Sequence, residues 1–496
     1  MSSRLRSTRP SVLSSARSTR ALAALAVVAG FAACAAPKPA AQPVEPAAAP
    51  VAATPVTPVT PAPAIDPATA PLTVPVKSLT LDNGLRVVMS RDTTAPVVAI
   101  AVYYNIGFRI EPRDRTGFAH LFEHMMFQGS QNLGKMEFIK MVQSNGGVLN
   151  GSTRFDFTNY FEVVPANTLE TMLWGESDRM RGLAVTQDNL TNQQGVVKSE
   201  VRVNVLNRPY GGFPWLDMPQ YANKNWHNAH NFYGDLTDLD HATLGDVQKF
   251  FKQYYAPNNA VLVVTGDFEY ETAQGWVKKY FSDIPRAPDI AKPDLAEPRQ
   301  EQEITAEKID KLADRPAVAV AYHVPARGTP EFYAFTLLHE ILLDGHDSAL
   351  FQNLVQNKKL TGELEGGINL LGNQFDYAGP MLWIVNAVHD KDKPAEQLVA
   401  AIDEAIEPLR KAPVDGKTLA RARVKARARL YDMVEGFFGF GRADLLASFA
   451  LFDNDATKIN QLEGELMKVT PALIQKTAEE YLRPTNRTIL KITTAK

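Results

Sequence analysis

The chain has 496 residues, of which 45% are hydrophobic and 22% are charged, a composition typical of folded globular proteins. This length exceeds what one ordinary core organises, so we expect two domains or more. The net charge of −3 provides no electrostatic footprint for nucleic acid and excludes that class of partner.

The N-terminal segment has the features of an export signal. Five arginines within the first 20 residues precede an apolar run, ALAALAVVAGFAA, that is too short to span a bilayer as a mature helix. The run ends at Cys34, the only cysteine, and FAAC resembles the lipobox of bacterial lipoproteins, with Phe31 in place of the usual leucine. We therefore expect residues 1–33 to be a lipoprotein-type signal peptide and Cys34 to be lipidated. The alternative is an ordinary signal peptide next to an unmodified cysteine.

Residues 34–75 consist almost entirely of Ala, Pro, Val and Thr. Such a segment cannot bury a core, so we expect an extended tether that holds a folded body away from a membrane. Ala35, in place of aspartate, follows the cysteine, as in lipoproteins sent to the outer membrane. The sequence therefore predicts an exported, periplasmic protein with a lipid anchor.

The folded body begins near residue 76 and alternates between strand and helix patterns. The residues around Asp82-Asn83-Gly84 indicate a hairpin. The further expected elements, in chain order, are a strand at 95–107, a helix at 117–127, a strand pair at 146–164, helices at 168–183 and 191–207, and a helix leading into a strand at 246–268. Because no strict strand–helix–strand alternation is present, the fold class predicted is α+β.

The pattern starts again after a proline-rich, charged linker at 286–303. The segment 315–343 repeats the order strand, loop, apolar helix, and aligning the two helices places Glu340 on Glu123, Leu337 on His120 and Ile341 on His124. We therefore expect two homologous domains, 76–285 and 304–496, each a mostly antiparallel sheet with helices packed on it. The second lacks the histidines, so the fold does not depend on them.

A histidine motif lies on the helix expected at 117–127. His120 and His124 are four residues apart, and Glu123 directly precedes the second histidine. Residues i and i+4 project from one face of a helix, so both rings can reach one ion at about 2.0–2.1 Å. A catalytic zinc also needs a third protein ligand and an open position, and Glu200 offers that ligand from the helix expected at 191–207. Glu123 then borders the metal and can take a proton from a bound water.

Other interpretations of these histidines stay open at this point. A short motif of this kind also arises by chance, and two histidines can be satisfied core residues, although burying both beside a glutamate is costly. His227 and His230 form a competing pair. They lie in an asparagine-rich stretch that indicates a loop, with no third ligand at an evident spacing.

The stretch HLFEHMMFQGS, followed by Glu200 in VVKSE, resembles the pitrilysin-type zinc metallopeptidases, and the resemblance extends over nearly the whole body. It implies one Zn²⁺ per chain, with His120, His124 and Glu200 as ligands. It also implies that Glu123 is the general base, which agrees with the chemistry of a zinc-activated water.

The same resemblance implies residues around the metal. Asn150, Gly151, Ser152 and Thr153 match the family's edge strand, which binds a peptide substrate by adding it as an extra β-strand. The alternative, which we consider the weaker one, is that these residues form only a hairpin turn in the sheet. Gln193 stands seven positions before Glu200, where many members have glutamate; a glutamine there can still hydrogen-bond a ligating imidazole.

One departure from the family bears on partners. Active members use an arginine and a tyrosine from the half without zinc, and the strand where we expect the arginine, GPMLWIVNAVHDK, has none. We therefore expect a partner, either a homologous chain without the zinc motif (a heterodimer) or a second copy of this chain (a homodimer).

The leading function is a zinc endopeptidase that hydrolyses peptides or unfolded segments in the periplasm. One alternative is a non-catalytic assembly subunit of the same fold, in which loss of ligands is usual. Another is a metal-binding protein without peptidase activity, which has no need of Glu123.

Overall fold

The structure is a computed structural model that describes residues 71–437 and 439–495. The predicted signal peptide, Cys34 and nearly all of the predicted tether lie outside the described residues. Within the described part of the chain, no helix has both the length and the apolar character that crossing a membrane requires.

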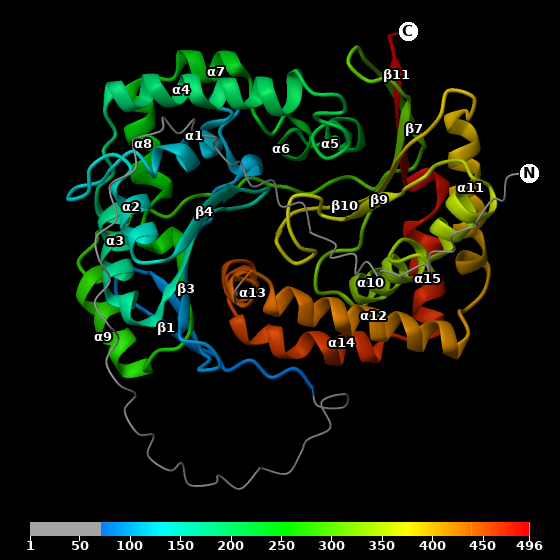
Figure 1. Cartoon of the computed structure of the whole chain (residues 1–496). Helices are drawn as coiled ribbons and strands as arrows, with labels where there is room; N and C mark the ends of the chain where they lie inside the picture. The colour runs from blue at the N-terminus through cyan, green and yellow to red at the C-terminus, as the bar shows by residue number, and fades with distance from the viewer. Residues whose placement is uncertain (1–70, 438, 496) are drawn as a thin grey trace, which may run out of the picture. The chain divides into compact units, whose positions relative to one another are not determined.

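The first sheet has six strands in the order β1-β2-β6-β3-β5-β4 (Figure 1). All neighbours are antiparallel except β2 and β6, which are parallel. The strands are β1 (Lys77–Thr80), β2 (Arg86–Arg91), β3 (Val97–Tyr104), β4 (Val148–Thr153), β5 (Thr158–Pro165) and β6 (Ala260–Gly266). The hairpin and the strand pair predicted from the sequence are both present, and β4 forms an edge of the sheet.

Strand β3 shows how this sheet is buried on both faces. Its residues alternate between two hydrophobic clusters: Ile100 and Val102 point to one face, and Ala99 and Ala101 point to the other. Because side chains alternate along a strand, a nearly continuous apolar run is what two covered faces require.

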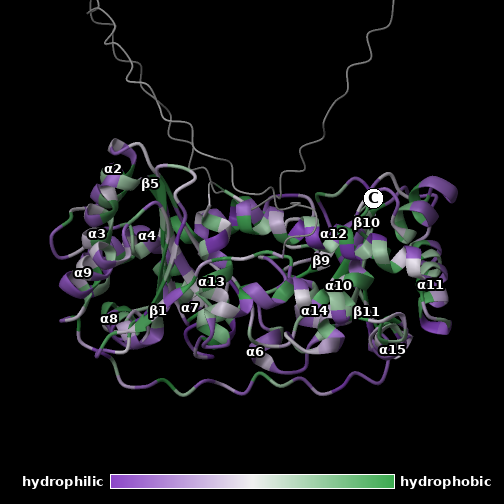
Figure 2. Cartoon of the chain, turned by 90° about the horizontal axis from the view of Figure 1, so that it is seen from below, coloured by the Kyte–Doolittle hydropathy of each residue, from purple (hydrophilic) through white to green (hydrophobic). Residues whose placement is uncertain are grey.

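Helices from the first half cover one face of this sheet and one end of it (Figure 1). They are α1 (Phe118–Met125), α2 (Glu137–Ser144), α3 (Leu169–Arg181), α4 (Gln187–Val201), α7 (Leu236–His241), α8 (Leu244–Tyr254) and α9 (Tyr270–Phe281). Two short helices of the same half, α5 (Met218–Ala222) and α6 (Trp226–Ala229), contact each other, and α5 packs on the second sheet. Figure 2 shows hydrophilic and hydrophobic residues alternating around outer helices such as α3 and α9, as expected for helices with one buried face.

The second sheet repeats the topology of the first. Its order, β7-β11-β8-β10-β9, corresponds to β2-β6-β3-β5-β4 of the first sheet, without a counterpart of β1. The pair β7 and β11 is parallel, like β2 and β6, and the other neighbours are antiparallel. The strands are β7 (Ile304–Asp310), β8 (Ala317–His323), β9 (Glu365–Ile368), β10 (Leu382–Val388) and β11 (Arg487–Thr494). The helices are α10 (Pro330–Leu342), α11 (Ala395–Lys411), α12 (Gly416–Glu435), α13 (Phe440–Phe452), α14 (Leu462–Lys468) and α15 (Pro471–Tyr481). The predicted α+β class with two sheet-and-helix layers is confirmed, while the domain limits around 286–303 stay a prediction.

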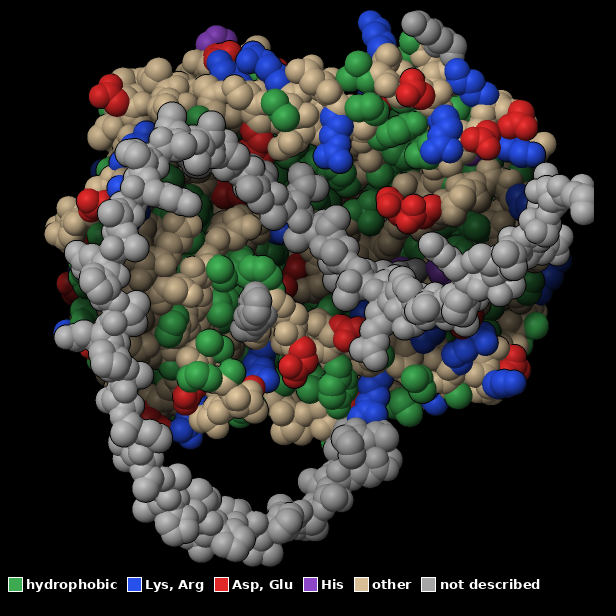
Figure 3. All heavy atoms as spheres, in the orientation of Figure 1, with side chains coloured by type: hydrophobic (Ala, Val, Ile, Leu, Met, Phe, Trp, Pro, Cys, Tyr) green, Lys and Arg blue, Asp and Glu red, His purple; other side chains and the backbone are tan. Residues whose placement is uncertain are grey.

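The two halves share one hydrophobic cluster across their junction. Helix α13 of the second half packs on the inner face of the first sheet, where the rings of Phe161 and Phe440 stack with centroids 3.7 Å apart. Tyr103 of β3 donates a hydrogen bond of 2.6 Å to Asp444 of α13. At the surface, Lys and Arg side chains are interspersed with Asp and Glu over the face shown in Figure 3, as the nearly balanced charge of the chain predicts.

A buried ion pair also links the halves. The side chains of Arg109 and Asp156 are 3% and 1% exposed and lie 3.3 Å apart. Asp156 accepts hydrogen bonds from the backbone amides of Ala378 and Gly379, and Arg109 donates to the carbonyl of Pro380. Both charges therefore fix a loop of the second half against the first.

Asp156→Ala is expected to lower the free energy of unfolding by about 3–5 kcal/mol, because it leaves the Arg109 guanidinium buried without its partner. Urea denaturation of the variant and the wild type measures this change. The matched control is Asp283→Ala, which breaks the exposed Arg181–Asp283 pair (Asp283 69% exposed) and is expected to cost much less. Equal losses of unfolding free energy in the two variants would contradict the conclusion that the buried ion pair stabilises the fold more than the exposed pair does.

Candidate metal and catalytic site

Helix α1 begins at a backbone turn that the local sequence supports. Gly117 precedes the helix with φ of +81°, a left-handed conformation that favours glycine, and a Cβ there would lie 2.8 Å from the carbonyl oxygen of Tyr233. The buried carboxylate of Glu111 accepts hydrogen bonds from the amides of Gly117 and Ala119. Burial raises the pKa of Glu111 to about 8, although these two hydrogen bonds oppose the shift. The start of the helix is thus fixed by a side chain outside it.

Three side chains converge between α1 and α4, which lie side by side in Figure 1. The Nε2 atom of His124 lies 3.1 Å from one carboxylate oxygen of Glu200, and the Nε2 atom of His120 lies 3.6 Å from the other. One ligand atom from each residue falls within 4.8 Å of the other two. No other cluster of this kind occurs within residues 71–437 and 439–495. The structure therefore brings together the three ligands predicted from the sequence.

The chemistry of this cluster fits a divalent transition metal. Two imidazoles and one carboxylate are a donor set that suits zinc in a catalytic site. Burial would raise the pKa of Glu200, but hydrogen bonds and charges from the two histidines outweigh it and hold the pKa well below its usual range, so the carboxylate stays ionised. Burial would lower the pKa of His120, but Glu200 and Glu123 outweigh it and raise that pKa. The acidic surroundings thus favour positive charge at this point.

Glu123 lies beside the cluster and is oriented by the edge strand. The hydroxyl of Thr153 in β4 donates a hydrogen bond of 2.7 Å to Oε2 of Glu123. A Cβ at Gly151 would lie 3.4 Å from Cγ of Glu123 and 3.2 Å from the ring of Tyr160. Glycine at this position therefore lets the strand approach the helix closely.

The segment predicted to bind substrate forms most of β4. Asn150, Gly151, Ser152 and Thr153 pair with β5 on one side, and β4 has no strand on its other side within the described residues. Ser152 donates a hydrogen bond of 2.5 Å to the side chain of Asn159. The segment is thus a sheet edge next to Glu123, and not an isolated hairpin turn.

Gln193 is buried on α4, but its amide donates to Asn192 at 2.8 Å. The Nδ1 atom of His120 is buried and has no hydrogen-bond partner among the described residues, so the predicted support of this imidazole by Gln193 is absent here.

Each histidine of the competing pair contacts a backbone carbonyl through its Nδ1 atom, while Nε2 of His230 is buried without a hydrogen-bond partner among the described residues. His227 Nδ1 lies 2.8 Å from the carbonyl oxygen of Arg109, and His230 Nδ1 lies 3.0 Å from that of Trp226, on whose ring His230 stacks. These contacts explain the pair without a metal.

Sequence reasoning missed two residues that shape the site. Glu111 caps α1, and the ring of Tyr233 packs edge-on against His120 with centroids 5.1 Å apart. Burial raises the pKa of Tyr233, with Glu200 and Glu123 adding to the effect, so its hydroxyl stays protonated. An acidic residue shortly before a helix start is a recognisable signal for Glu111, whereas nothing in the sequence places Tyr233 beside His120.

Comparison with known proteins gives two family matches. The model described as Insulinase (Peptidase family M16) matches residues 86–223, and the model described as Peptidase M16 inactive domain matches residues 241–425. The zinc protease PqqE of Helicobacter pylori is 27% identical over 83% of this chain and 91% of its own length. An uncharacterized zinc protease of Bacillus subtilis, YmxG, is 23% identical over 58% of this chain and 68% of its own length.

Solved structures of similar fold include a protease from Helicobacter pylori with a TM-score of 0.76 and 27% identity, covering 85% of this chain and 99% of that one. A peptidase M16 inactive domain from Pseudomonas fluorescens has a TM-score of 0.75 at 14% identity, covering 85% and 98%. The periplasmic protease PqqL from Escherichia coli has a TM-score of 0.69 at 16% identity, covering 86% of this chain and 48% of that one. The last two similarities, at 14% and 16% identity, show a common fold and nothing more.

Zinc binding is expected to depend on the three clustered residues. His120→Ala or Glu200→Ala should weaken zinc binding by more than about 100-fold, beyond the effect of changing a residue that only supports a ligand. Competition with a chelating dye measures the affinity. His227→Ala, from the competing pair, is the matched control and should bind zinc like the wild type. A full complement of tightly bound zinc in His120→Ala would place the metal elsewhere.

Proposed function

The chain belongs to the M16 peptidase family, and we propose that it is an active zinc endopeptidase that hydrolyses peptides or unfolded polypeptide segments. One observation carries this proposal: a complete ligand set, His120, His124 and Glu200, stands beside a carboxylate, Glu123, that the substrate-binding edge itself orients. A metal reservoir or a scaffold has no need of that carboxylate.

His120, His124 and Glu200 would hold one zinc ion per chain through two Nε2 atoms and a carboxylate oxygen. When bound, zinc acts as a Lewis acid and lowers the pKa of a water molecule towards neutrality. The side chain of His124 is 19% exposed, against 6% for His120, so the more open side of the cluster is the one at His124.

Glu123 is the residue that moves protons in this proposal. Thr153 occupies its Oε2 atom, which leaves Oε1 to accept the proton of the attacking water and to deliver it to the leaving amine. Thr153 is part of β4, and the same strand would pair with the substrate backbone. Strand β4 would therefore position both Glu123 and the scissile bond. This arrangement favours a near-attack geometry.

The substrate is proposed to add to β4 as an extra strand. Main-chain pairing with a free sheet edge tolerates many side chains, which suits extended peptides of varied sequence. Folded proteins cannot present such a strand without local unfolding.

Location and partners extend the proposal. The leader features and Cys34 support export to the periplasm with a lipid anchor at the outer membrane. Strand β10 carries no arginine, and this supports a partner, either a zinc-lacking homologous chain or a second copy, that completes the site. The same absence favours the second candidate function, a non-catalytic assembly subunit.

Glu123→Gln should retain one zinc per chain and lose at least about 100-fold in kcat, because it removes the proton acceptor and keeps the shape of the side chain. Cleavage of a mixed peptide library and metal analysis of the same samples measure both quantities. Glu271→Gln, at an 85% exposed glutamate, is the control and should match the wild type. Zinc-loaded wild type that cuts no peptide would favour the non-catalytic alternative.

A further inference from the structure

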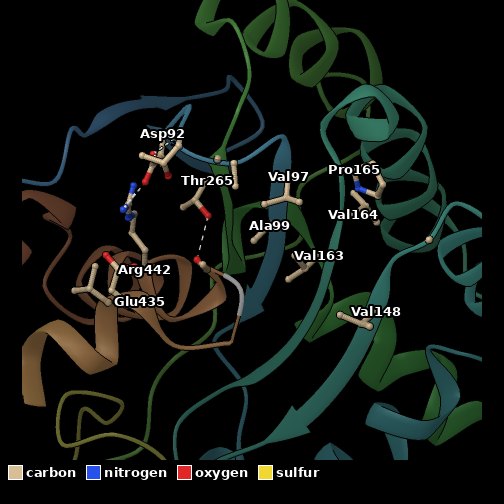
Figure 4. Close-up of a pocket in the computed structure, with 16 residues that line it drawn as sticks. Asp92, Val97, Ala99, Val148, Val163, Val164, Pro165, Thr265, Glu435 and Arg442 are labelled. Carbon is tan, nitrogen blue, oxygen red and sulfur yellow. Dashed lines mark hydrogen bonds and ion pairs between the residues drawn. The ribbon is translucent and has the colours of Figure 1, made fainter. Parts of the chain in front are cut away.

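A cavity of about 470 Å³ lies between the inner face of the first sheet and the corner that joins α12 to α13 (Figure 4). Its volume falls within the range of about 300–1,000 Å³ that small-ligand pockets occupy. Val97, Ala99, Val148 and Val163 provide apolar walls on the sheet side. Nothing in the catalytic arrangement described above uses this cavity.

The cavity follows one cross-strand row of the sheet. Val148 of β4 is paired with Val163 of β5, Val163 with Ala99 of β3, and Ala99 with Thr265 of β6. Directly paired residues point to the same face, so these four side chains form a continuous row that ends at the free edge. Val148 is 43% exposed, whereas the other three are buried.

In the neighbouring cross-strand row, on the side nearer Glu123, side chains fill the space between the sheet and α13. It contains Asn150 and Phe161, and the ring of Phe161 stacks on Phe440 of α13. The described residues leave space between sheet and helices at the row of Val148 and at the following row of Val97 and Pro165. A strand added to β4 would therefore place a side chain beside Val148, at the mouth of the cavity.

The register relates this position to the scissile bond. Thr153, which holds Glu123, is five residues from Val148 along β4, a distance of about 17 Å in an extended strand. The scissile bond lies near the segment from Gly151 to Thr153. The substrate side chain at the cavity mouth thus belongs to a residue about three to five positions from the scissile bond.

We propose that this cavity is a substrate subsite that takes one large apolar side chain, aliphatic or aromatic, of an extended peptide bound along β4. The inference rests on the proposed peptidase function and on the strand-addition mode. It adds a preference that main-chain pairing alone does not provide.

The charges at the rim agree with an apolar occupant. The guanidinium of Arg442 is engaged by Asp92 at 2.7 Å, as Figure 4 shows. The rim also carries the exposed carboxylate of Glu435. An acidic side chain at this position would meet like charge and lose its hydration, so it should be the least favoured.

The test uses the full chain with zinc and a set of quenched fluorescent peptides that share one sequence. Leu, Phe, Ser or Glu is placed singly at positions three to six residues on either side of the cut, which mass spectrometry locates. At one of these positions, Leu or Phe should raise kcat/KM about tenfold over Ser, and Glu should fall below Ser. Fluorescence anisotropy with Glu123→Gln measures the binding of the same peptides without cleavage.

Val148→Asp should reduce the tenfold preference to within about twofold, in cleavage and in binding measured on the Glu123→Gln background. Val148→Thr is a second, more conservative variant, because threonine keeps the shape of valine and should leave the chain folded. It should reduce the preference about threefold. Val424→Asp is the matched control, since Val424 is a 68% exposed valine on α12, and it should keep the full preference.

The outcomes separate this inference from the proposed function. If the wild type cleaves peptides without a positional preference, or if Val148→Asp keeps the preference, the subsite is refuted and the peptidase function stands. If no peptide is cleaved but the Leu peptide still binds about tenfold more tightly in a Val148-dependent way, the subsite stands and the peptidase function fails. If neither cleavage nor selective binding occurs, both fail. A change of oligomeric state in Val148→Asp would make the cavity an interface between copies and refute the subsite.

Discussion

The hydrogen bond from Thr153 to Glu123 joins the helix that carries the two histidines to the free edge of the first sheet. This contact needs close approach of strand and helix, which Gly151 permits because a larger side chain would press on Tyr160 and Glu123. It also needs a fixed helix start, which the buried carboxylate of Glu111 provides. The geometry of the whole site follows from these restraints on one short helix.

The second half shows what the same helix does when no metal site is built on it. In α10, the position equivalent to Glu123 is Glu340, whose Oε1 accepts a hydrogen bond of 2.8 Å from Arg429. Burial raises the pKa of Glu340 to about 7 although Arg429 opposes the shift. The neighbouring His339 accepts a hydrogen bond of 3.1 Å from Trp383, and burial lowers its pKa to about 3. Polar groups of the duplicated helix thus serve packing in one copy and chemistry in the other.

Local sequence patterns predicted several elements of the first half, the first strand and helix of the second, and the histidine pair of the site. The spacing of His120 and His124 fixes their common face, since a helix repeats every 3.6 residues. The apolar run of β3, the alternation at 146–164, and the repeat of strand, loop and helix predicted strands of the sheets and their duplication. The 75 residues between His124 and Glu200 carry no geometric information, so Glu200 on the helix expected at 191–207 was a candidate that the family resemblance supported.

Contacts between distant segments could not be predicted in this way. The approach of Tyr233 to His120 depends on a loop whose path no periodicity specifies. The hydrogen bond from Gln193 to Asn192 depends on side-chain rotamers that no sequence pattern specifies. The packing of α13 on the first sheet places part of the second half against the first, and only the folded chain reveals it.

The two faces of β4 separate chemistry from selectivity. Thr153 and Gly151 face α1, and Thr153 holds Glu123, the proposed base, whereas Val148 and Asn150 face α13 and the cavity. A peptide paired with this strand presents alternate side chains to the two sides. Residues on the side that faces α1 are constrained by the geometry that proton transfer requires. A short sequence motif is therefore enough to identify them. Residues on the second side are limited only by the shape of a space between two distant parts of the chain. In the proposed function, they can vary without disturbing the metal ligands, so substrate preference can change while the proposed reaction stays the same.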